Sequence, residues 1–250
     1  MISYHPDSRF LTDFAAANLR TSEAVCVSAH LEFCGKCRAH VQQLADIGGH
    51  LLARLQPREV AVGSFDRLMS RIDNGDCAAQ TAAAAMLPAV QESLALVDEA
   101  SSRAGLAPTR GVFLPRALRR LSAGGLHNLS WVQFGSNLRV APVRIFGDAR
   151  KTAIYDIKAG GKMPEHDHRG EEITVLLKGS FSDAEGSYTQ GDFVVRNAGE
   201  AHQPMATQDT DCICLVSLER PVRPLGWFYR LLEPYVQYRL HKTLELNTAF

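Results

Sequence analysis

The sequence has little of what marks a secreted or membrane-bound protein. Six cysteines among 250 residues are too sparse for a disulfide scaffold. No window reaches about 18 uncharged apolar residues, the length that a membrane-spanning helix needs. The first residues also lack the basic-then-apolar pattern of a signal peptide. We therefore expect a cytoplasmic protein with no membrane partner, whose cysteines are reduced thiols or metal ligands.

The chain also lacks an excess of charge of either sign, since 27 basic residues balance 27 acidic ones. A neutral chain has no general electrostatic attraction to nucleic acid. Proteins or small molecules are therefore the expected partners, and no direct contact with nucleic acid is expected. Apolar residues make up 46 % of the chain, which is enough for one large core or two small ones.

Apolar residues recur at helical spacing through roughly the first 85 residues. The pattern predicts helices within 10–19, 25–33 and 41–55 and a short helix within 65–72. Gly48 and Gly49 interrupt the third pattern, and each costs about 1 kcal/mol relative to alanine in a helix. Either a close helix contact or a local break would explain them.

The rest of the chain changes character twice. Residues 86–125 are predicted to form a helix followed by a linker. The helical pattern begins at residue 80 and runs to 102, interrupted by Pro88, and the linker at 106–125 is rich in glycine, proline and arginine. Residues 126–220 contain short, regularly spaced β-like runs, which favour a barrel or sandwich. Residues 221–250 are predicted to form a C-terminal helix that Pro234 kinks or breaks. The predicted class is α+β, with a small N-terminal helical bundle at 1–85 followed by an antiparallel β-barrel.

A first candidate metal site lies in the helical part. His30, Cys34 and Cys37 are spaced so that one helix face, or a helix end followed by a turn, brings them together. Two thiolates and an imidazole suit zinc, which takes four tetrahedral ligands. His5, which should be extended because it precedes Pro6, is the preferred fourth ligand, and His40 is the competitor.

A second candidate site lies in the β-rich part, where two glycine-flanked motifs follow each other. The first carries His166, His168 and Glu172, and the second ends in His202. His166 and His168 are two apart and so share one face of a strand. Three imidazoles and one carboxylate suit zinc or another divalent transition metal. Glu171 could replace Glu172, although its spacing fits less well.

These motifs carry a resemblance to known families. The two β-region motifs resemble the paired motifs of the cupin superfamily, a small antiparallel barrel, although Asn197 and Ala206 depart from the usual second motif. His5, His30, Cys34 and Cys37 fall on the ligand pattern of zinc anti-sigma domains. The combination resembles the ChrR-type anti-sigma factors, and the stretch from Pro164 to Phe181 is especially similar to their cupin segment.

The resemblance implies a regulatory mechanism and no enzymatic activity. The helical domain would bind an extracytoplasmic-function sigma factor, and that domain alone would suffice for inhibition. The cupin domain at 126–220 would sense singlet oxygen or an organic peroxide and cause release. Because cupins often pair and the C-terminal helix has an apolar face, we also consider a homodimer through the cupin domain.

Two alternatives remain open at this point. An open metal site in a cupin can also support catalysis, such as that of a dioxygenase or isomerase, with Tyr155 or Tyr188 as the only visible acid–base candidates. Cys212 and Cys214 lie on one side of a strand and could be oxidised near the metal, although small core residues are the preferred interpretation.

Overall fold

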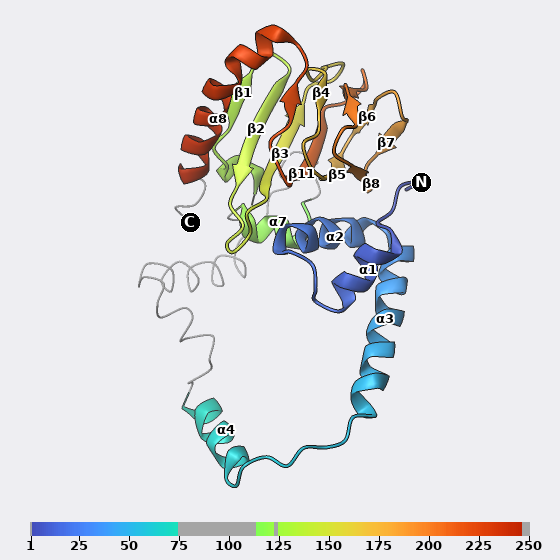
Figure 1. Cartoon of the computed structure of the whole chain (residues 1–250), viewed down its shortest axis with the longest axis vertical. Helices are drawn as coiled ribbons and strands as arrows, with labels where there is room; N and C mark the ends of the chain where they lie inside the picture. The colour runs from blue at the N-terminus through green and yellow to red at the C-terminus, as the bar shows by residue number, and fades with distance from the viewer. Residues whose placement is uncertain (1, 75–113, 123–124, 247–250) are drawn as a thin grey trace, which may run out of the picture. The chain divides into compact units, whose positions relative to one another are not determined.

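The computed structural model describes residues 2–74, 114–122 and 125–246, and Figure 1 shows the arrangement of their helices and strands. Contacts within the chain divide it into two compact units, one formed by Met1–Gly49 with Thr109–Phe250 and one by His50–Pro108. The helices predicted within 80–102 lie outside the described residues. Within the described residues, no helix is both long and apolar enough to cross a membrane.

Helices dominate the N-terminal part, as the apolar spacing predicts. They are α1 (Ser8–Ala15), α2 (Thr21–Phe33), α3 (Gly35–Ala53) and α4 (Ser64–Asp73). Asp7 caps α1 through a hydrogen bond from the Phe10 backbone N–H to its carboxylate (2.9 Å). Helix α3 continues through Gly48 and Gly49, and a Cβ added at either glycine would meet nothing within 4 Å. Neither a break nor a close contact within this chain therefore accounts for the two glycines.

The segment predicted as a linker is partly helical. Helix α7 (Arg116–Leu121) forms after Pro115, and it packs against α2. Leu118 is 1 % exposed and belongs to the same core cluster as the buried side chains of α2. Helix α7 is too short to show an apolar period, and the glycines and prolines around it are typical of a linker.

The β region is built entirely from antiparallel pairs, which confirms the predicted α+β class. A short 3₁₀ helix, η1 (Leu126–Asn128), precedes twelve strands: β1 (Val132–Phe134), β2 (Leu138–Val143), β3 (Lys151–Ile157), β4 (His166–Asp167), β5 (Glu172–Lys178), β6 (Ser180–Ser182), β7 (Ser187–Thr189), β8 (Phe193–Arg196), β9 (Ala201–His202), β10 (Met205–Ala206), β11 (Cys212–Leu218) and β12 (Arg223–Pro224). They form a six-stranded sheet in the order β1-β2-β3-β11-β5-β8 and two three-stranded sheets, β10-β6-β7 and β12-β4-β9.

The six-stranded sheet is buried on both faces, which explains why its central strands are nearly continuous apolar runs. Along β5, Ile173, Val175 and Leu177 belong to the core shared with the N-terminal helices. The alternate residues Glu172 and Thr174 line a cavity inside the β region. Helix α2 covers the outer face, in contact with β5, β8 and β11.

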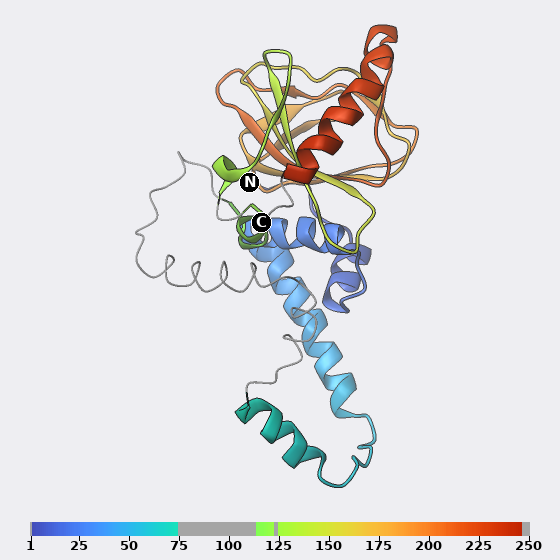
Figure 2. The same cartoon turned by 90° about the vertical axis from the view of Figure 1, so that its left-hand side faces the viewer.

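The C-terminal helix α8 (Trp227–Leu246) lies against β1 and β2 (Figure 2). Pro234 lies inside this helix and does not end it. The prediction of a C-terminal helix is confirmed, and the break at Pro234 is wrong.

Two candidate metal centres

Among the described residues, two groups of histidines and cysteines have ligand atoms that all lie within 4.8 Å of one another. The first comprises His5, His30, Cys34 and Cys37, and the second comprises His166, His168 and His202. Both groups had been singled out from the sequence. Whether these residues bind metal stays a prediction, but their local chemistry can be compared with what a metal requires.

The first centre lies where α2 meets α3. His30 is in the last turn of α2, Cys34 ends that helix in an extended conformation (φ −106°, ψ 103°), and Cys37 begins the next. His5 comes from the extended segment before α1, and its Nδ1 lies 3.5 Å from Cys34 Sγ and 3.4 Å from Cys37 Sγ. Zinc bonds of 2.0–2.3 Å in a tetrahedron separate nitrogen and sulfur ligands by roughly 3.5 Å. His40, the competing fourth ligand, is exposed and is not in the group.

The hydrogen bonding of His30 directs one free nitrogen lone pair into this centre. Its Nδ1 lies 2.7 Å from the Gly191 carbonyl oxygen, which can only accept, so Nδ1 carries the proton. Its Nε2 is buried and has no hydrogen-bond partner. Burial lowers the pKa of His30 to about 4, which keeps the ring neutral, and burial raises the pKa of the Cys37 thiol to about 11. A bound divalent cation would satisfy the lone pair and favour the thiolate forms, so the donor set fits zinc.

The second centre depends on the pairing of β4 with β9, which places His166 directly opposite His202. His166 Nδ1 donates to the Pro164 carbonyl (2.8 Å), and His202 Nδ1 donates to the Asp183 carboxylate (2.8 Å). In the neutral form of the two rings, both Nε2 atoms therefore carry lone pairs, and they face each other at 3.1 Å. Two lone pairs at that distance repel unless a cation lies between them, and both ring nitrogens of His168 also lack a hydrogen-bond partner.

Glu172 lies at the edge of this second group. Its Oε1 accepts a hydrogen bond from Thr174 Oγ1 (2.9 Å), and its Oε2 lies 3.5 Å from His168 Nδ1. Glu171, the alternative ligand, instead pairs with Arg150 (3.2 Å). Glu172 is not part of the group whose ligand atoms lie within 4.8 Å of one another, but it lines the same cavity as His166 and His202. Three imidazoles with a carboxylate nearby suit a divalent transition metal.

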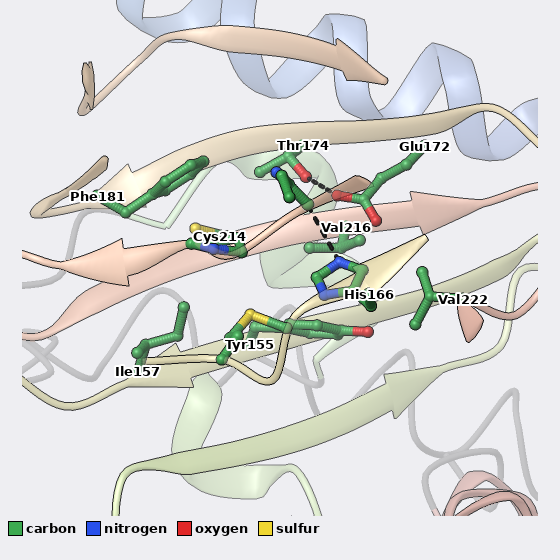
Figure 3. Close-up of a pocket in the computed structure, with 12 residues that line it drawn as sticks. Tyr155, Ile157, His166, Glu172, Thr174, Phe181, Cys214, Val216 and Val222 are labelled. Atoms are coloured by element: carbon green, nitrogen blue, oxygen red, sulfur yellow. Dashed lines mark hydrogen bonds between the residues drawn. The ribbon is translucent and has the colours of Figure 1, made fainter. Parts of the chain in front are cut away.

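A small cavity of about 30 Å³ adjoins the second centre, and Figure 3 shows the residues around it. His166, Glu172 and His202 line it together with Tyr155 and Cys214. Burial, together with the charge of Glu172, raises the pKa of Tyr155, so its hydroxyl is a poor acid or base at neutral pH. Tyr188 bonds to Arg196 instead of lining the cavity.

Two aspartates that were not predicted from the sequence hold the predicted ligands of these centres in place. Asp183 is fully buried at its side chain, and it accepts hydrogen bonds from His202 and Arg196. These bonds outweigh the effect of burial and hold the pKa of Asp183 below its usual value. The Asp192 carboxylate accepts hydrogen bonds from the backbone N–H groups of Ser3 and Tyr4. Neither aspartate has a spacing that distinguishes it from an ordinary turn residue, because its partners are remote in the sequence.

Comparison with known proteins shows which proteins have a similar sequence and arrangement. Residues 123–221 match the model of the ChrR cupin-like domain. The anti-sigma-E factor ChrR of Cereibacter sphaeroides is 27 % identical over 234 residues, which cover 94 % of this chain and 98 % of that protein. The chain is therefore similar to a ChrR-type anti-sigma factor along nearly its whole length.

A solved structure agrees with this similarity along nearly the whole length. The crystal structure of Rhodobacter sphaeroides SigE in complex with the anti-sigma ChrR matches with a TM-score of 0.68 at 26 % identity. The match covers 88 % of this chain and all of the matched chain, so it includes helices as well as the cupin region. The resemblance inferred from the ligand motifs is thereby confirmed. The proteins that match along most of this chain are anti-sigma factors, which are regulatory proteins and not enzymes.

Proposed function

We propose that this protein binds an extracytoplasmic-function sigma factor through apolar faces of α3 and α4. The matched ChrR structure is a complex with SigE, which supports a sigma factor as the partner here. The observation that carries the proposal is a set of large apolar side chains exposed to solvent on the two helices: Ile47, Leu51, Leu52 and Leu55 in and after α3, and Phe65, Leu68, Met69 and Ile72 in α4.

The exposure of these side chains is unusual for an isolated protein. Leu52 is 70 % exposed and Phe65 is 70 % exposed, and within each helix the apolar residues recur three or four positions apart. Single exposed apolar residues are common, but a repeated stripe on a helix marks a surface that another protein covers. Gly48 and Gly49, whose added Cβ atoms would meet nothing within 4 Å among the described residues, would let the backbone of a partner come close.

The first experiment measures binding of the full chain to the sigma factor encoded beside its gene. We expect a stoichiometric complex by calorimetry, and we expect Leu52→Asp and Leu68→Asp each to weaken it about 30-fold or more, since a central apolar contact contributes roughly 2 kcal/mol. Phe146→Asp is the matched control, because Phe146 is 67 % exposed but lies outside both helices. Equal effects of all three substitutions, or no complex at all, would refute the proposal.

The same proposal includes a cause of release. The cupin region would sense singlet oxygen or an organic peroxide, and the sigma factor would then dissociate. The buried histidine cluster beside a cavity in this region supports a sensing role. Exposing the purified complex to a photosensitiser in light, or to an organic hydroperoxide, should release the sigma factor on size-exclusion chromatography. The His166→Ala variant should retain it, and equal release from both would refute the sensing role.

The resident metals belong to the same proposal. When bound, zinc at the N-terminal centre would hold three separate segments together, and a divalent transition metal would occupy the cupin centre with His166, His168, Glu172 and His202. Elemental analysis should find one zinc lost in Cys34→Ser, and one transition metal lost in His202→Ala. Loss of neither metal in these variants would count against the assignment.

A further inference from the structure

The two metal centres are not independent in this structure, because one segment of the cupin region touches the ligands of both. This segment runs from Asp183 to Phe193 and includes β7, and we call it the bridging segment. It contains no predicted metal ligand. Figure 1 shows the N-terminus of the chain beside β7 and β8, where this segment ends.

At the cupin end, the bridging segment orients His202. Asp183 Oδ2 accepts from His202 Nδ1 (2.8 Å) and from Arg196 (3.0 Å). Its Oδ1 accepts from the Tyr188 hydroxyl (3.3 Å) and from the backbone N–H of Glu185 (2.9 Å). These bonds tie the position of the Asp183 carboxylate to that of His202, whose imidazole is oriented with Nε2 toward the metal centre.

At the other end, the bridging segment holds the segment that carries His5. Asp192 Oδ1 accepts from the backbone N–H groups of Ser3 (2.8 Å) and Tyr4 (3.0 Å), and the Phe193 N–H donates to the Tyr4 carbonyl (3.0 Å). The adjacent Gly191 carbonyl accepts from His30 Nδ1 (2.7 Å). Two of the four predicted zinc ligands are thus positioned by the cupin region.

Tyr188 joins the two ends. Its ring lies against the Tyr4 ring, with centroids 4.7 Å apart, and its hydroxyl accepts a hydrogen bond from Arg196 (2.6 Å). Tyr188 is 1 % exposed and fixed by its buried neighbours, and Tyr4, which is 37 % exposed, packs one side of its ring against it. A Cβ at Gly186 would lie 2.7 Å from the Tyr4 hydroxyl, which shows how closely Tyr4 fits against this segment.

We infer that Asp183, Tyr188 and Tyr4 form a mechanical link through which metal binding at the cupin centre strengthens metal binding at the N-terminal centre. A metal that fixes His202 would also fix Asp183 and, through the packed tyrosines, the backbone that presents His5. Coupling between two binding sites is reciprocal, so each metal must change the affinity of the other by the same factor. The inference concerns the metals alone and does not require a sigma factor.

The test is a double-mutant cycle on the full chain. Cobalt is titrated in competition with a chelator, and the charge-transfer absorption of cobalt bound to thiolate reports the N-terminal centre, as its loss in Cys34→Ser would verify. His202→Ala, which removes a ligand only at the cupin centre, should weaken cobalt binding at the N-terminal centre about 10-fold, the lower end of what loss of outer-shell support costs. In a Tyr4→Leu background, which removes the ring contact with Tyr188, His202→Ala should have no further effect.

Two further variants keep the test decisive if Tyr4→Leu does not fold. Asp183→Asn should weaken the N-terminal centre severalfold, whereas Asp156→Asn should not, although Asp156 is also a buried aspartate paired with an arginine. Cys37→Ser, which removes a ligand only at the N-terminal centre, should likewise lower the affinity of the cupin centre. The link is refuted if His202→Ala leaves the thiolate-bound cobalt unchanged, if Cys37→Ser leaves the cupin centre unchanged, or if Asp156→Asn matches Asp183→Asn. Failure of sigma-factor binding would leave these results unaffected.

Discussion

At the scale of single residues, the contact between the N-terminal helices and the cupin region depends on a few buried ionic groups. Arg150, whose side chain is 2 % exposed, bonds to Glu23 of α2 (3.3 Å), to Glu171 (3.2 Å) and to Ser217 (2.9 Å). Asp148 accepts from both the backbone N–H and the hydroxyl of Ser22, and so caps α2 from outside the helix. These groups therefore link α2 to the cupin region by an ion pair and by a capping carboxylate.

Replacing Arg150 should measurably destabilise the protein. In Arg150→Met the carboxylates of Glu23 and Glu171 lose their shared partner, and breaking a buried ion pair costs about 3 kcal/mol. Urea unfolding of the full chain measures the free energy of unfolding. Arg9→Met is the control, since Arg9 contacts the same Glu171 at 3.5 Å but its side chain is 60 % exposed, and it should cost under about 1 kcal/mol. Similar losses in the two variants would contradict this view of the interface.

The buried histidines predict a pH dependence of the metal-free protein. Burial lowers the pKa values of His30 and His202 from 6.5 to about 4. Between these values the unfolded chain binds protons that the folded chain does not, so stability is full above pH 6.5 and decreases as the pH falls toward 4. Urea unfolding with a chelator present, at several pH values in this range, would show the decrease. A flat or opposite dependence would show that these rings are protonated in the folded state.

At the scale of elements, spacing in the sequence correctly predicted helices that have a clear apolar stripe. The stripe from 65 to 72 predicts a helix, and α4 spans Ser64–Asp73. The same stripe does not reveal that its side chains are exposed, because periodicity reports which residues share a face and not what covers it. Helix α7 was missed for a related reason: six residues between prolines and glycines are too few to show a period.

The glycines of α3 allow a prediction at this scale. Gly48→Ala meets open space, so it should stabilise the free helix by up to about 1 kcal/mol, seen as slower amide hydrogen exchange in the second half of α3. The added methyl group should nevertheless weaken sigma-factor binding, because it obstructs close approach of the partner. Ala45→Gly, in the same helix, is a control for the change in helix propensity alone. Unchanged or tighter binding by Gly48→Ala would show that these glycines have no role in the interface.

At the scale of the whole molecule, the cupin region completes the N-terminal metal centre. Gly191 and Asp192 hold the segments that carry His30 and His5, and they lie more than 150 residues away along the chain. The resemblance to zinc anti-sigma domains implied that residues 1–85 would suffice for inhibition, and that implication stays a prediction. An isolated 1–85 fragment would lose the hydrogen bonds of His30 with Gly191 and of the segment that carries His5 with Asp192. Its metal centre should therefore be weaker.

A fragment of residues 1–85 should therefore bind zinc about 10-fold more weakly than the full chain, which is the expected effect of losing outer-shell hydrogen bonds. Chelator competition on both proteins measures this difference. Asp192→Ala in the full chain should move the affinity toward that of the fragment, because it releases Ser3 and Tyr4. Equal zinc affinity of fragment and full chain would show that the cupin contacts do not support the centre.

The sequence by itself determined the two ligand sets and the order of helices before strands, because ligand spacing and apolar periodicity are local properties of the chain. It placed His30 with Cys34 and Cys37, and His166 with His168, within a few residues of each other. Only the tertiary structure decided that Asp183 supports His202, that Arg150 joins α2 to the cupin region, and that α3 and α4 keep apolar faces in solvent. The first two depend on contacts between segments that are remote in the sequence. The third depends on which described residues cover a helix face, and apolar periodicity reports neither property.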